Sequence, residues 1–343
     1  MPAEWDRHEA TWLAWPHNTS DWPGKFAPIP WVYAEIVRAL VPGEIVRIIV
    51  ASASHERSAR RILAKACVDC SRVEFFRIPT DRSWTRDIGP LFVRHDAPPR
   101  EVAINQFAFT GWAKYANWKK DAKVPARAAQ ALGMRSFRPA MQGRPLVLEG
   151  GAIDVNGSGT LLTTEECLLD PAVQPRNPGL GRAETEQALR DALGVSTILW
   201  LGKGIAGDDT HGHVDDVARF VNGTTIVLCE EPDAADTNHA PLCENRERLR
   251  TARLESGAPP DVISLPMPSP LLFDGVRLPA SYANFYIANA AVLVPTFNDP
   301  NDRSALGILS ELFPGRAVRG IHAVDLVWGL GTLHCLTQQQ PAR

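Results

Sequence analysis

One pattern recurs along the chain and restricts its fold: a polar cluster is followed by two apolar runs that a turn joins. The four examples follow the polar residues Asp87, Glu149, His213 and the pair Tyr282 and Asn284. An Asn-Gly pair, which is a hairpin signal, separates the two runs at 156–157 and again at 222–223. If these units are equivalent and surround an axis, their leading polar residues gather at one end. Residues far apart in sequence would then build one site.

Candidate helices alternate with these runs, which indicates an α/β fold. Apolar spacing and end signals predict helices over the ranges 31–40, 54–67, 184–193 and 301–313. The second helix follows a strand-like run at Glu44–Ala51 and takes Ser54 as its N-cap. Gly194 and the Pro314-Gly315 pair supply stop signals for the last two helices.

The composition narrows the class of protein. The chain has 343 residues, of which 45% are hydrophobic, and a formal net charge of -3. This is enough for a sizeable core, and it offers no electrostatic footprint for nucleic acid or an anionic membrane. No apolar run approaches the ~20 residues of a membrane-spanning helix, and the N-terminal segment does not resemble a signal peptide. We therefore expect a cytoplasmic protein that binds neither nucleic acid nor membrane.

The six cysteines are too sparse in a chain of this length for a disulfide framework. Cys67 and Cys70 form one CxxC without a second pair, whereas a zinc site needs about four ligands. We interpret them as cysteines near a helix end. Cys335 differs, because it lies in a glycine-rich turn beside the imidazole of His334. Both features suit a reactive thiolate, although a free cysteine is more often a small buried hydrophobe.

The segment HGHVD at 211–215 permits three interpretations. On a strand, His211, His213 and Asp215 would point to one side, which suits the metal site of an amidohydrolase. No later histidine lies in a clear ligand pattern. The histidines would alternatively be structural. In the third interpretation His213 is a general acid/base and Asp215 anchors a substrate.

Two further clusters suit a cationic ligand. In DRSWTRDIGP, Asp87 would grip a cation while Trp84 walls the pocket. A buried Arg86–Asp87 ion pair is the structural alternative. In LEGG, the two glycines let the backbone and a ligand approach closely, which leaves Glu149 facing that space.

Taken in order, the motifs resemble those of the agmatine deiminase family. This family belongs to the guanidine-modifying (pentein) superfamily and is close to the Porphyromonas-type peptidyl-arginine deiminases. The resemblance covers essentially the whole chain and is carried by MPAEWDRHEATWLAWP, SWTRDIGP, LEGGAID, GTLLTTEECLL, GDDTHGHVDD, LPASYANFYIAN and LHCLTQQQP. The chain departs from the family at His211, where many members have Asp, and at GLGTL, where they have a glycine-rich sequence.

The resemblance implies a fold. It predicts a single domain over residues 1–343, built as a pentein α/β-propeller. Such a propeller is a pseudo-fivefold ring of ββαβ units with the site on its central axis. The repeated hairpins agree with this expectation.

The resemblance also implies roles for individual residues. It assigns the nucleophile to Cys335 and the acid/base to His213. The carboxylates that hold the guanidinium fall on Asp87, Glu149 and Asp215. No step of the implied reaction requires a metal or an organic cofactor.

The charges near the motifs favour agmatine as the small-molecule guanidine substrate. Asp209 joins the three carboxylates, and Arg86 is the only nearby base, with Asp87 expected to occupy it. Agmatine is a dication, whereas free arginine would need a cation for its α-carboxylate, which is costly to bury unpaired. We expect hydrolysis to N-carbamoylputrescine and ammonia through an amidino-cysteine, in putrescine and polyamine biosynthesis. Trp84 and Asp209 are expected among the substrate-binding residues.

Other functions stay open from the sequence alone. A peptidyl-arginine deiminase or another guanidine-modifying hydrolase would share these residues. Two alternatives are of other classes: a metal-dependent amidohydrolase that uses His211 and His213, and a non-catalytic propeller that binds a partner. The cysteine, the histidine and the carboxylates argue against the second. The sequence leaves open the contacts at the far end of the substrate and a possible homo-oligomer.

Overall fold

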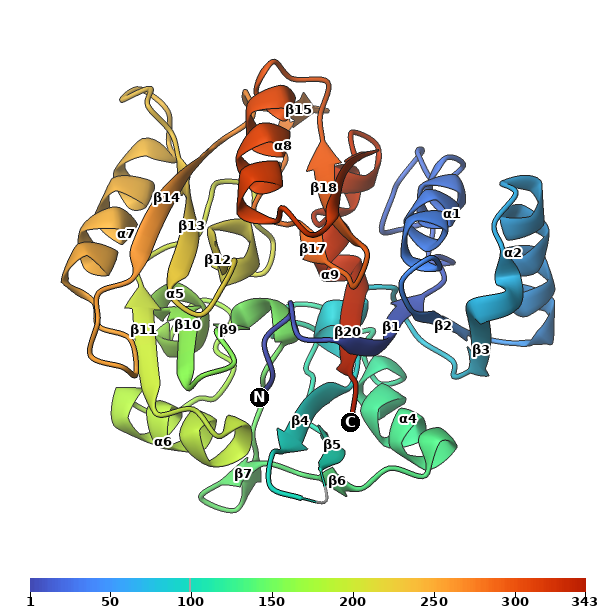
Figure 1. Cartoon of the computed structure of the whole chain (residues 1–343), viewed down its shortest axis with the longest axis horizontal. Helices are drawn as coiled ribbons and strands as arrows, with labels where there is room; N and C mark the ends of the chain where they lie inside the picture. The colour runs from blue at the N-terminus through green and yellow to red at the C-terminus, as the bar shows by residue number, and fades with distance from the viewer. Residues whose placement is uncertain (99) are drawn as a thin grey trace.

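The computed structural model describes residues 1–98 and 100–343, and within them five similar units surround a central axis (Figure 1). In each unit a short inner strand pairs antiparallel with a middle strand. The middle strand pairs parallel with an outer strand. A helix connects the middle strand to the outer one and lies on the outside of the ring in Figure 1. The predicted α/β ring is thus confirmed.

Four units follow one another along the chain. The second unit contains β4 (Leu91–His95), β5 (Glu101–Asn105), α4 (Val124–Leu132) and β6 (Ser136–Phe137). The third contains β9 (Asp154–Val155), β10 (Thr160–Thr164), α5 (Glu165–Leu169), α6 (Arg182–Leu193) and β11 (Thr197–Leu201). The fourth contains β12 (Ala218–Phe220), β13 (Thr225–Glu230), α7 (His239–Thr251) and β14 (Asp261–Pro266). The fifth contains β17 (Tyr286–Ile287), β18 (Ala291–Thr296), α8 (Asn301–Leu312) and β19 (Ala317–His322).

The first unit closes the ring with segments from both ends of the sequence. Its elements are β1 (His8–Ala14), α1 (Ile29–Leu40), β2 (Ile45–Val50), α2 (Ala53–Lys65), β3 (Val73–Arg77) and β20 (Thr337–Pro341). The inner strand β20 pairs antiparallel with the middle strand β1. The sequence pattern predicted only the other four units, because no hairpin turn joins β20 to β1.

Short helical turns lie at the axis. They precede the inner strands and comprise α3 (Thr85–Ile88), η3 (Gly150–Ala152), η4 (Val214–Asp216) and α9 (Leu333–Leu336). Turn α3 contacts both η3 and α9, and η3 contacts η4. The polar residues that lead the repeats therefore gather at one place.

The remaining elements decorate the ring. They are the hairpins β7 (Ala140–Met141) with β8 (Arg144–Pro145) and β15 (Leu272–Phe273) with β16 (Val276–Arg277), and the turns η1 (Cys70–Arg72), η2 (Asp121–Lys123) and η5 (Leu326–Gly329). No helix in the described ranges combines the length and apolar character needed to cross a membrane.

The predicted helices form close to their expected bounds, with one wrong cap. Helix α6 ends at Gly194, which takes the left-handed conformation at φ 69°. Helix α2 is capped by Ser52, whose hydroxyl accepts from the backbone N–H of His55. Ser54 instead lies inside the first turn, so its predicted cap role is wrong. Cys67 and Cys70 are free and follow α2, as expected.

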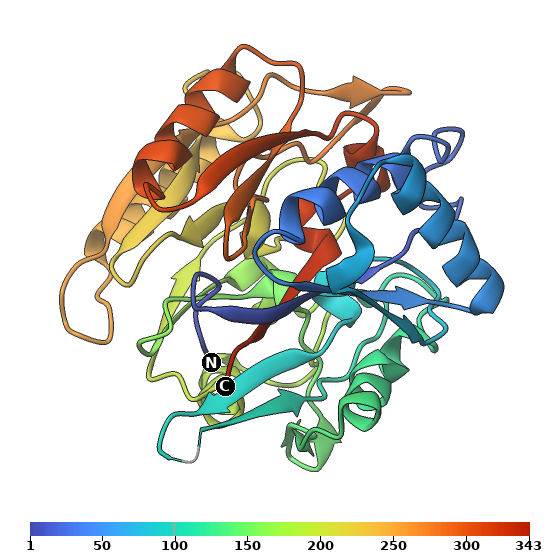
Figure 2. The same cartoon turned by 45° about the vertical axis from the view of Figure 1, so that its right-hand side comes forward.

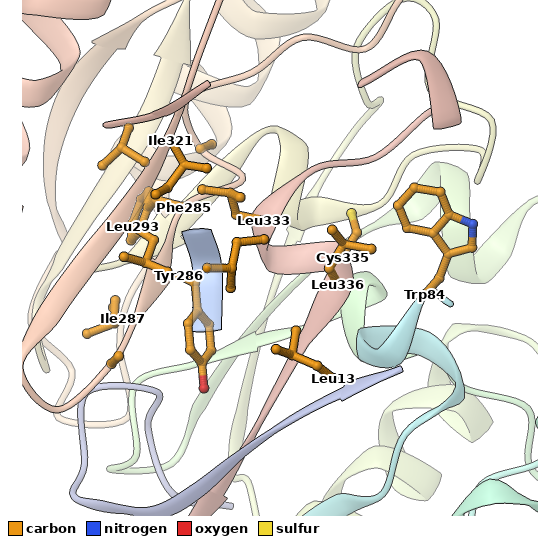
Figure 3. Close-up of a cluster of buried hydrophobic side chains, with 14 of the residues drawn as sticks. Leu13, Trp84, Phe285, Tyr286, Ile287, Leu293, Ile321, Leu333, Cys335 and Leu336 are labelled. Carbon is orange, nitrogen blue, oxygen red and sulfur yellow. The ribbon is translucent and has the colours of Figure 1, made fainter. Parts of the chain in front are cut away.

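Figure 3 shows the buried side chains around the axis turn that carries Cys335. Leu333 and Leu336 on α9 belong to the same hydrophobic cluster as Leu13 of β1 and Phe285. Both leucines are fully buried. Packing on two sides of Cys335 thus holds its short helix in place.

Candidate active site

The axis turns border a cleft of about 460 Å³. Four of the predicted site residues line it: Trp84, Asp87, Asp209 and Cys335. Figure 3 shows the indole of Trp84 beside Cys335. Gly331 lies between these two side chains, since a Cβ there would come within 2.9 Å of the indole and 3.2 Å of Cys335 Sγ. A bulkier residue at this position would therefore fill the space above the thiol.

Asn284 fixes the helix that carries Cys335. Its Oδ1 accepts from the Thr332 hydroxyl at 2.8 Å and from the backbone N–H of His334 at 3.0 Å. Its Nδ2 donates to Cys335 Sγ at 3.1 Å. The sequence pattern placed Asn284 at the head of a repeat but assigned it no role. Its place in that repeat, equivalent to that of Asp87, was the available signal.

The thiol of Cys335 lies among carboxylates. Asp215 Oδ2 is 3.7 Å from Sγ. Burial and the charges of Asp215, Asp216 and Asp87 raise the pKa of the Cys335 thiol well above its ordinary value. A cation bound in the cleft would offset this effect and favour the thiolate.

His334 does not contact the thiol. Its Nδ1 lies 2.6 Å from Asp215 Oδ2, and its Nε2 lies 2.9 Å from Glu4 Oε2. His334 is adjacent to Cys335 in sequence, but its two ring nitrogens are both directed to carboxylates. Successive residues of a helix point ~100° apart, so the two neighbouring side chains leave α9 in different directions.

Asp87 is oriented by two donors. Its Oδ1 accepts from the backbone N–H of Gly151 at 3.0 Å, and its Oδ2 accepts from the indole of Trp112 at 2.9 Å. A Cβ at Gly151 would lie 2.5 Å from His213 Nδ1 and 3.1 Å from an oxygen of Asp87. Gly151 therefore lets the backbone approach the His213 ring and Asp87, and a close approach of a ligand at LEGG stays a prediction. Burial raises the pKa of Asp87, although His213 acts in the opposite direction.

Arg86 does not pair with Asp87. Its guanidinium donates to Glu4 Oε2 at 2.9 Å and to Gln339 Oε1 at 2.7 Å. The predicted Arg86–Asp87 pair is wrong, because these neighbours also point in different directions from the turn α3. Asp87 is consequently left without a cationic partner from its own turn.

His213 lies between three carboxylates. Its Nδ1 is 3.9 Å from Asp87 Oδ1 and 4.0 Å from Asp215 Oδ1, and its Nε2 is 3.8 Å from Glu149 Oε2. Among the described residues, no hydrogen-bond partner satisfies either ring nitrogen or Asp215 Oδ1. Although burial acts in the opposite direction, Asp87, Cys167 and Glu149 raise the pKa of His213 well above its ordinary value. Its Nδ1 thus faces Asp87 and Asp215, and its Nε2 faces Glu149.

Glu149 has a partner that the sequence analysis missed. Arg176 Nε lies 3.2 Å from each Glu149 oxygen, and both side chains are fully buried. Burial alone would raise the pKa of Glu149, but Arg176 and His213 lower it to about 2. Glu149 is therefore ionised at neutral pH and faces His213 Nε2 as a carboxylate. The available signal was the PRNP segment that follows the third hairpin.

The two histidines of HGH have separate environments. His211 has a φ of 63°, and its Nε2 lies 2.9 Å from Asp170 Oδ2. The segment is a turn rather than a strand, so the arrangement that the metal interpretation needs is not formed. In the described part of the chain, one group of three potential ligands lies within 4.8 Å, namely Glu149, Cys167 and His213. Glu149 of this group already forms an ion pair with the guanidinium of Arg176.

The outer wall of the cleft carries paired charges. Asp209 accepts from the Tyr115 hydroxyl at 2.6 Å and forms an ion pair with Lys114. Arg82 lines the cleft and is paired with Asp21, whose pKa is raised by burial to about 6 against the opposing effect of Arg82. The expectation of a single basic residue near the site is therefore wrong. Each of these cations is already bound to a carboxylate.

Comparison with known proteins now gives the site its context. The family model of the Porphyromonas-type peptidyl-arginine deiminases matches residues 1–341. The chain belongs to this family. The match spans all five units and every axis turn.

Several relatives are similar over 95% of their length. An agmatine deiminase of Ectopseudomonas mendocina is 34% identical over 366 aligned residues, covering 100% of this chain and 95% of the relative. The solved agmatine deiminase of Enterococcus faecalis has a TM-score of 0.90 at 30% identity and covers 99% of this chain and 95% of that one. The C. jejuni agmatine deiminase solved with substrate bound has a TM-score of 0.84 at 29% identity, with coverages of 99% and 95%.

Proposed function

We propose that the protein is an agmatine deiminase, which hydrolyses agmatine to N-carbamoylputrescine and ammonia. One observation carries the proposal: Cys335 and Asp87 line one cleft, and Asp215 and the unpaired ring of His213 lie directly behind them, at 3.7 Å from Cys335 Sγ and 3.9 Å from Asp87 Oδ1 respectively. A guanidinium is planar and presents its donors in a fork, which carboxylates accept in pairs. The similarity to agmatine deiminases over the whole chain supports the same activity.

The substrate guanidinium is held by Asp87 and Asp215. Each Asp87 oxygen has one protein donor and keeps a further lone pair, and Asp215 Oδ1 has no partner in the described residues. Glu149 was predicted to share this role. Its ion pair with Arg176 favours a different one, in which it orients His213 through Nε2.

The first half-reaction forms a covalent intermediate. The bound cation offsets the carboxylates around Cys335 and favours loss of the thiol proton to solvent. The resulting thiolate attacks the central guanidinium carbon. His213, protonated in the free enzyme, donates its proton to the departing nitrogen, and ammonia leaves. An amidino-cysteine remains on Cys335.

The second half-reaction consumes water. His213 is now neutral and accepts a proton from a water molecule, which attacks the amidino carbon. Collapse of the second tetrahedral adduct breaks the C–S bond, releases N-carbamoylputrescine and restores the thiolate with a protonated His213. The hydroxyl proton of that adduct passes to solvent, where it is taken up by the released ammonia, so the net products are N-carbamoylputrescine and ammonium. The outline needs no metal or organic cofactor.

The far end of agmatine is an ammonium. Asp209 and Asp21 on the outer wall suit it, and their ion pairs with Lys114 and Arg82 leave no free cation for an α-carboxylate at these positions. Trp84 supplies an apolar wall for the methylene chain. Burying an unpaired carboxylate costs several kcal/mol, so free arginine should be a poor substrate.

Three further features belong to the same proposal, namely the domain organisation, the compartment and the oligomeric state. We propose that residues 1–343 act as one domain, because β20 and β1 close the ring. Six free cysteines suit a reducing compartment such as the cytoplasm. A homo-oligomer stays a prediction that light scattering would test.

The test is ammonia release from agmatine, arginine and a peptidyl-arginine under the same conditions. We expect kcat/KM for agmatine to exceed that for arginine by orders of magnitude, at ~1.4 kcal/mol per tenfold. Arg82→Gln is the matched control, since it would weaken arginine turnover selectively only if Arg82 bound a substrate carboxylate. Comparable constants for the two substrates would contradict agmatine specificity, and no ammonia from any guanidine would contradict the deiminase.

A further inference from the structure

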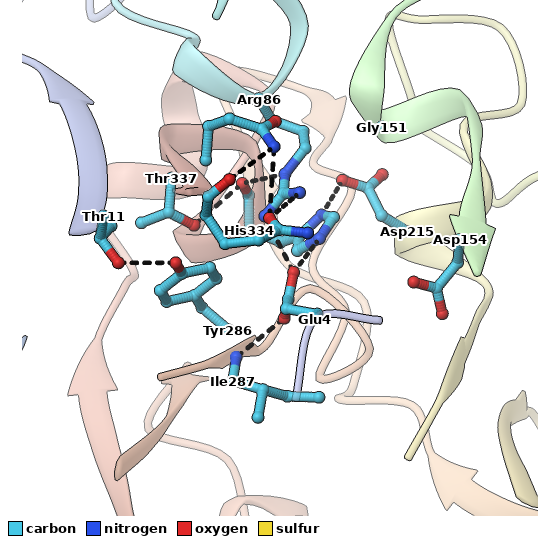
Figure 4. Close-up of polar contacts among 12 residues, drawn as sticks. Glu4, Thr11, Arg86, Gly151, Asp154, Asp215, Tyr286, Ile287, His334 and Thr337 are labelled. Atoms are coloured by element: carbon cyan, nitrogen blue, oxygen red, sulfur yellow. Dashed lines mark hydrogen bonds and ion pairs between the residues drawn. The ribbon is translucent and has the colours of Figure 1, made fainter. Parts of the chain in front are cut away.

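His334 connects the substrate-binding carboxylate to a buried ion network (Figure 4). Its Nδ1 lies 2.6 Å from Asp215 Oδ2 and its Nε2 lies 2.9 Å from Glu4 Oε2, and the side chain is 2% exposed. A neutral imidazole has one N–H and one acceptor nitrogen, so it cannot donate to both carboxylates. The geometry therefore fits an imidazolium that donates from both nitrogens.

Glu4 is the anchor of this arrangement. Its Oε1 accepts from Arg219 at 2.9 Å and from the backbone N–H of Ile287 at 2.8 Å, and its Oε2 accepts from Arg86 and His334, each at 2.9 Å. Burial acts to raise the pKa of Glu4, but Arg219, His334 and Arg86 hold it well below its ordinary range. The four donors come from four different units of the ring. Glu4 is thus a charged group with a fixed position.

This anchor fixes the orientation of Asp215. One of its oxygens, Oδ2, is held by His334, whereas Oδ1 has no hydrogen-bond partner among the described residues and lies 4.0 Å from His213 Nδ1. The held oxygen is also the one nearest to Cys335 Sγ, at 3.7 Å. A positive charge on His334 therefore sits next to the carboxylate that most closely approaches the nucleophile.

We propose that His334 is a positioning residue: held between Glu4 and Asp215 as an imidazolium, it directs Asp215 Oδ1 to the substrate guanidinium and offsets the negative charge beside Cys335. The proposal rests on the proposed function, since it presumes a guanidinium in the cleft. Besides Asp215, the charged groups near the thiol are Asp87, Asp216 and His213. None of them carries a partner equivalent to the pair that His334 forms with Glu4.

The test uses His334→Gln in the full-length protein and two readouts. The first is the rate of alkylation of Cys335 by iodoacetamide in the free enzyme, followed by mass spectrometry of its peptide over roughly pH 6 to pH 10. We expect the midpoint to move up by about one pH unit, because a neighbouring positive charge is lost. The second is agmatine turnover. We expect kcat/KM to fall ~10²-fold near neutral pH, as for a small misplacement in an active site, and the loss to narrow at high pH.

His8→Gln is the matched control. His8 is buried, and its ring nitrogens lie 2.9 Å from Glu44 Oε1 and 2.6 Å from the carbonyl oxygen of Glu4, without contact to Asp215. We expect this variant to lose stability while its alkylation midpoint and kcat/KM stay at the wild-type values. A folded His334→Gln variant with an unchanged alkylation midpoint would overturn the proposal, whatever its activity, because a purely structural role predicts that result.

A measurement on the wild-type protein covers the case in which His334→Gln does not fold. Ring-nitrogen NMR of ¹⁵N-histidine protein should show His334 with both nitrogens protonated. The ring of His8 also lies between two oxygens, and its signals are assigned by their loss in His8→Gln. A single protonated nitrogen on His334 would contradict the proposal. Neither the alkylation nor the NMR readout uses a substrate. Failure of the wild type to deiminate agmatine would therefore refute the proposed function separately.

Discussion

Two clusters of buried charges lie on either side of Asp215, and they differ in how their hydrogen bonds are filled. Around Glu4, both carboxylate oxygens receive two donors each. Beside Cys335 and Asp87, both ring nitrogens of His213 and Asp215 Oδ1 lack a partner in the described residues. Buried polar groups are normally satisfied because unmade hydrogen bonds are costly. The satisfied cluster therefore holds the ring together, and the unsatisfied one marks where a substrate completes the bonding.

The largest expected effect is a loss of catalysis with the fold and its stability unchanged. Cys335→Ser should lower agmatine turnover by more than ~10⁴-fold, because a serine hydroxyl here has no base to ionise it. The melting temperature should stay at the wild-type value, measured by calorimetry. Cys70→Ser, which alters a cysteine outside the cleft, is the control and should retain full activity. Substantial turnover by Cys335→Ser would falsify the mechanism.

Substitutions of the two histidines of HGH should differ strongly in their effect on turnover. His213→Ala should cost ~10²–10⁴-fold in kcat, as expected for the loss of a general acid/base. His211→Ala should cost little, because its imidazole contacts Asp170 rather than the site. Steady-state ammonia assays after treatment with EDTA would check both. Equal losses in the two variants, restored by added zinc, would instead favour the metal-dependent interpretation.

Substitutions in the satisfied cluster around Glu4 should lower the stability of the protein. Arg219 is fully buried and donates to Glu4 at 2.9 Å and to the carbonyl oxygen of Phe285 at 2.8 Å. Arg219→Met should lower the free energy of unfolding by ~3–5 kcal/mol, because it leaves a buried carboxylate with fewer donors. Denaturant unfolding would measure this. A fully stable variant would show that the cluster does not hold the units together.

Asp121 is intermediate between the two clusters, because only one of its carboxylate oxygens has hydrogen-bond partners in the described residues. Its Oδ1 accepts from the backbone N–H groups of Asp81 and Arg82 at 2.7 and 3.3 Å, whereas its Oδ2 is buried without a partner among the described residues. Burial raises its pKa to about 7. A raised pKa means that the stability contributed by the protonated form is present at low pH and is lost as the pH rises towards 7.

Asp121→Asn should therefore stabilise the protein at pH 8 and change little near pH 4. The amide keeps the Oδ1 acceptor and removes the buried charge. We expect a gain of a few degrees in melting temperature, at ~2–4 °C per kcal/mol, and it should grow between these two pH values. Differential scanning fluorimetry across the range checks this. A gain that is constant with pH would contradict burial of a titrating carboxyl group.

The sequence predicted the parts of the site that lie at the head of a hairpin. Asp87, Glu149 and His213 precede their strands in the same way, so the repeat placed them together. It did not predict the partners that lie in loops, such as Arg176 and Arg82, because an ion pair formed by a loop residue leaves no periodic signal. Nor did it predict which way a side chain leaves a short turn. The error at Arg86 has this cause.

The first unit was missed for a different reason. Its inner strand reads TQQQP, which is polar, yet it is wholly buried. Gln340 accepts from the indole of Trp12 at 2.9 Å, across 328 residues of sequence. Hydrophobic periodicity finds strands whose burial rests on apolar side chains. A strand buried through side-chain hydrogen bonds to distant residues gives no such pattern.

The closure of the ring by β1 and β20 bears on how the protein is made. Ribosomes add ~5–20 residues per second, so β1 waits roughly 16–66 s after its synthesis for β20, the strand that covers its inner edge (Figure 2). During that time the nascent chain presents an unpaired strand edge, which is a site for misassociation or for chaperones. The segment that completes the edge also carries Cys335. Catalytic activity therefore emerges only when β20 has been translated and has paired with β1. A prematurely terminated chain is inert towards guanidines.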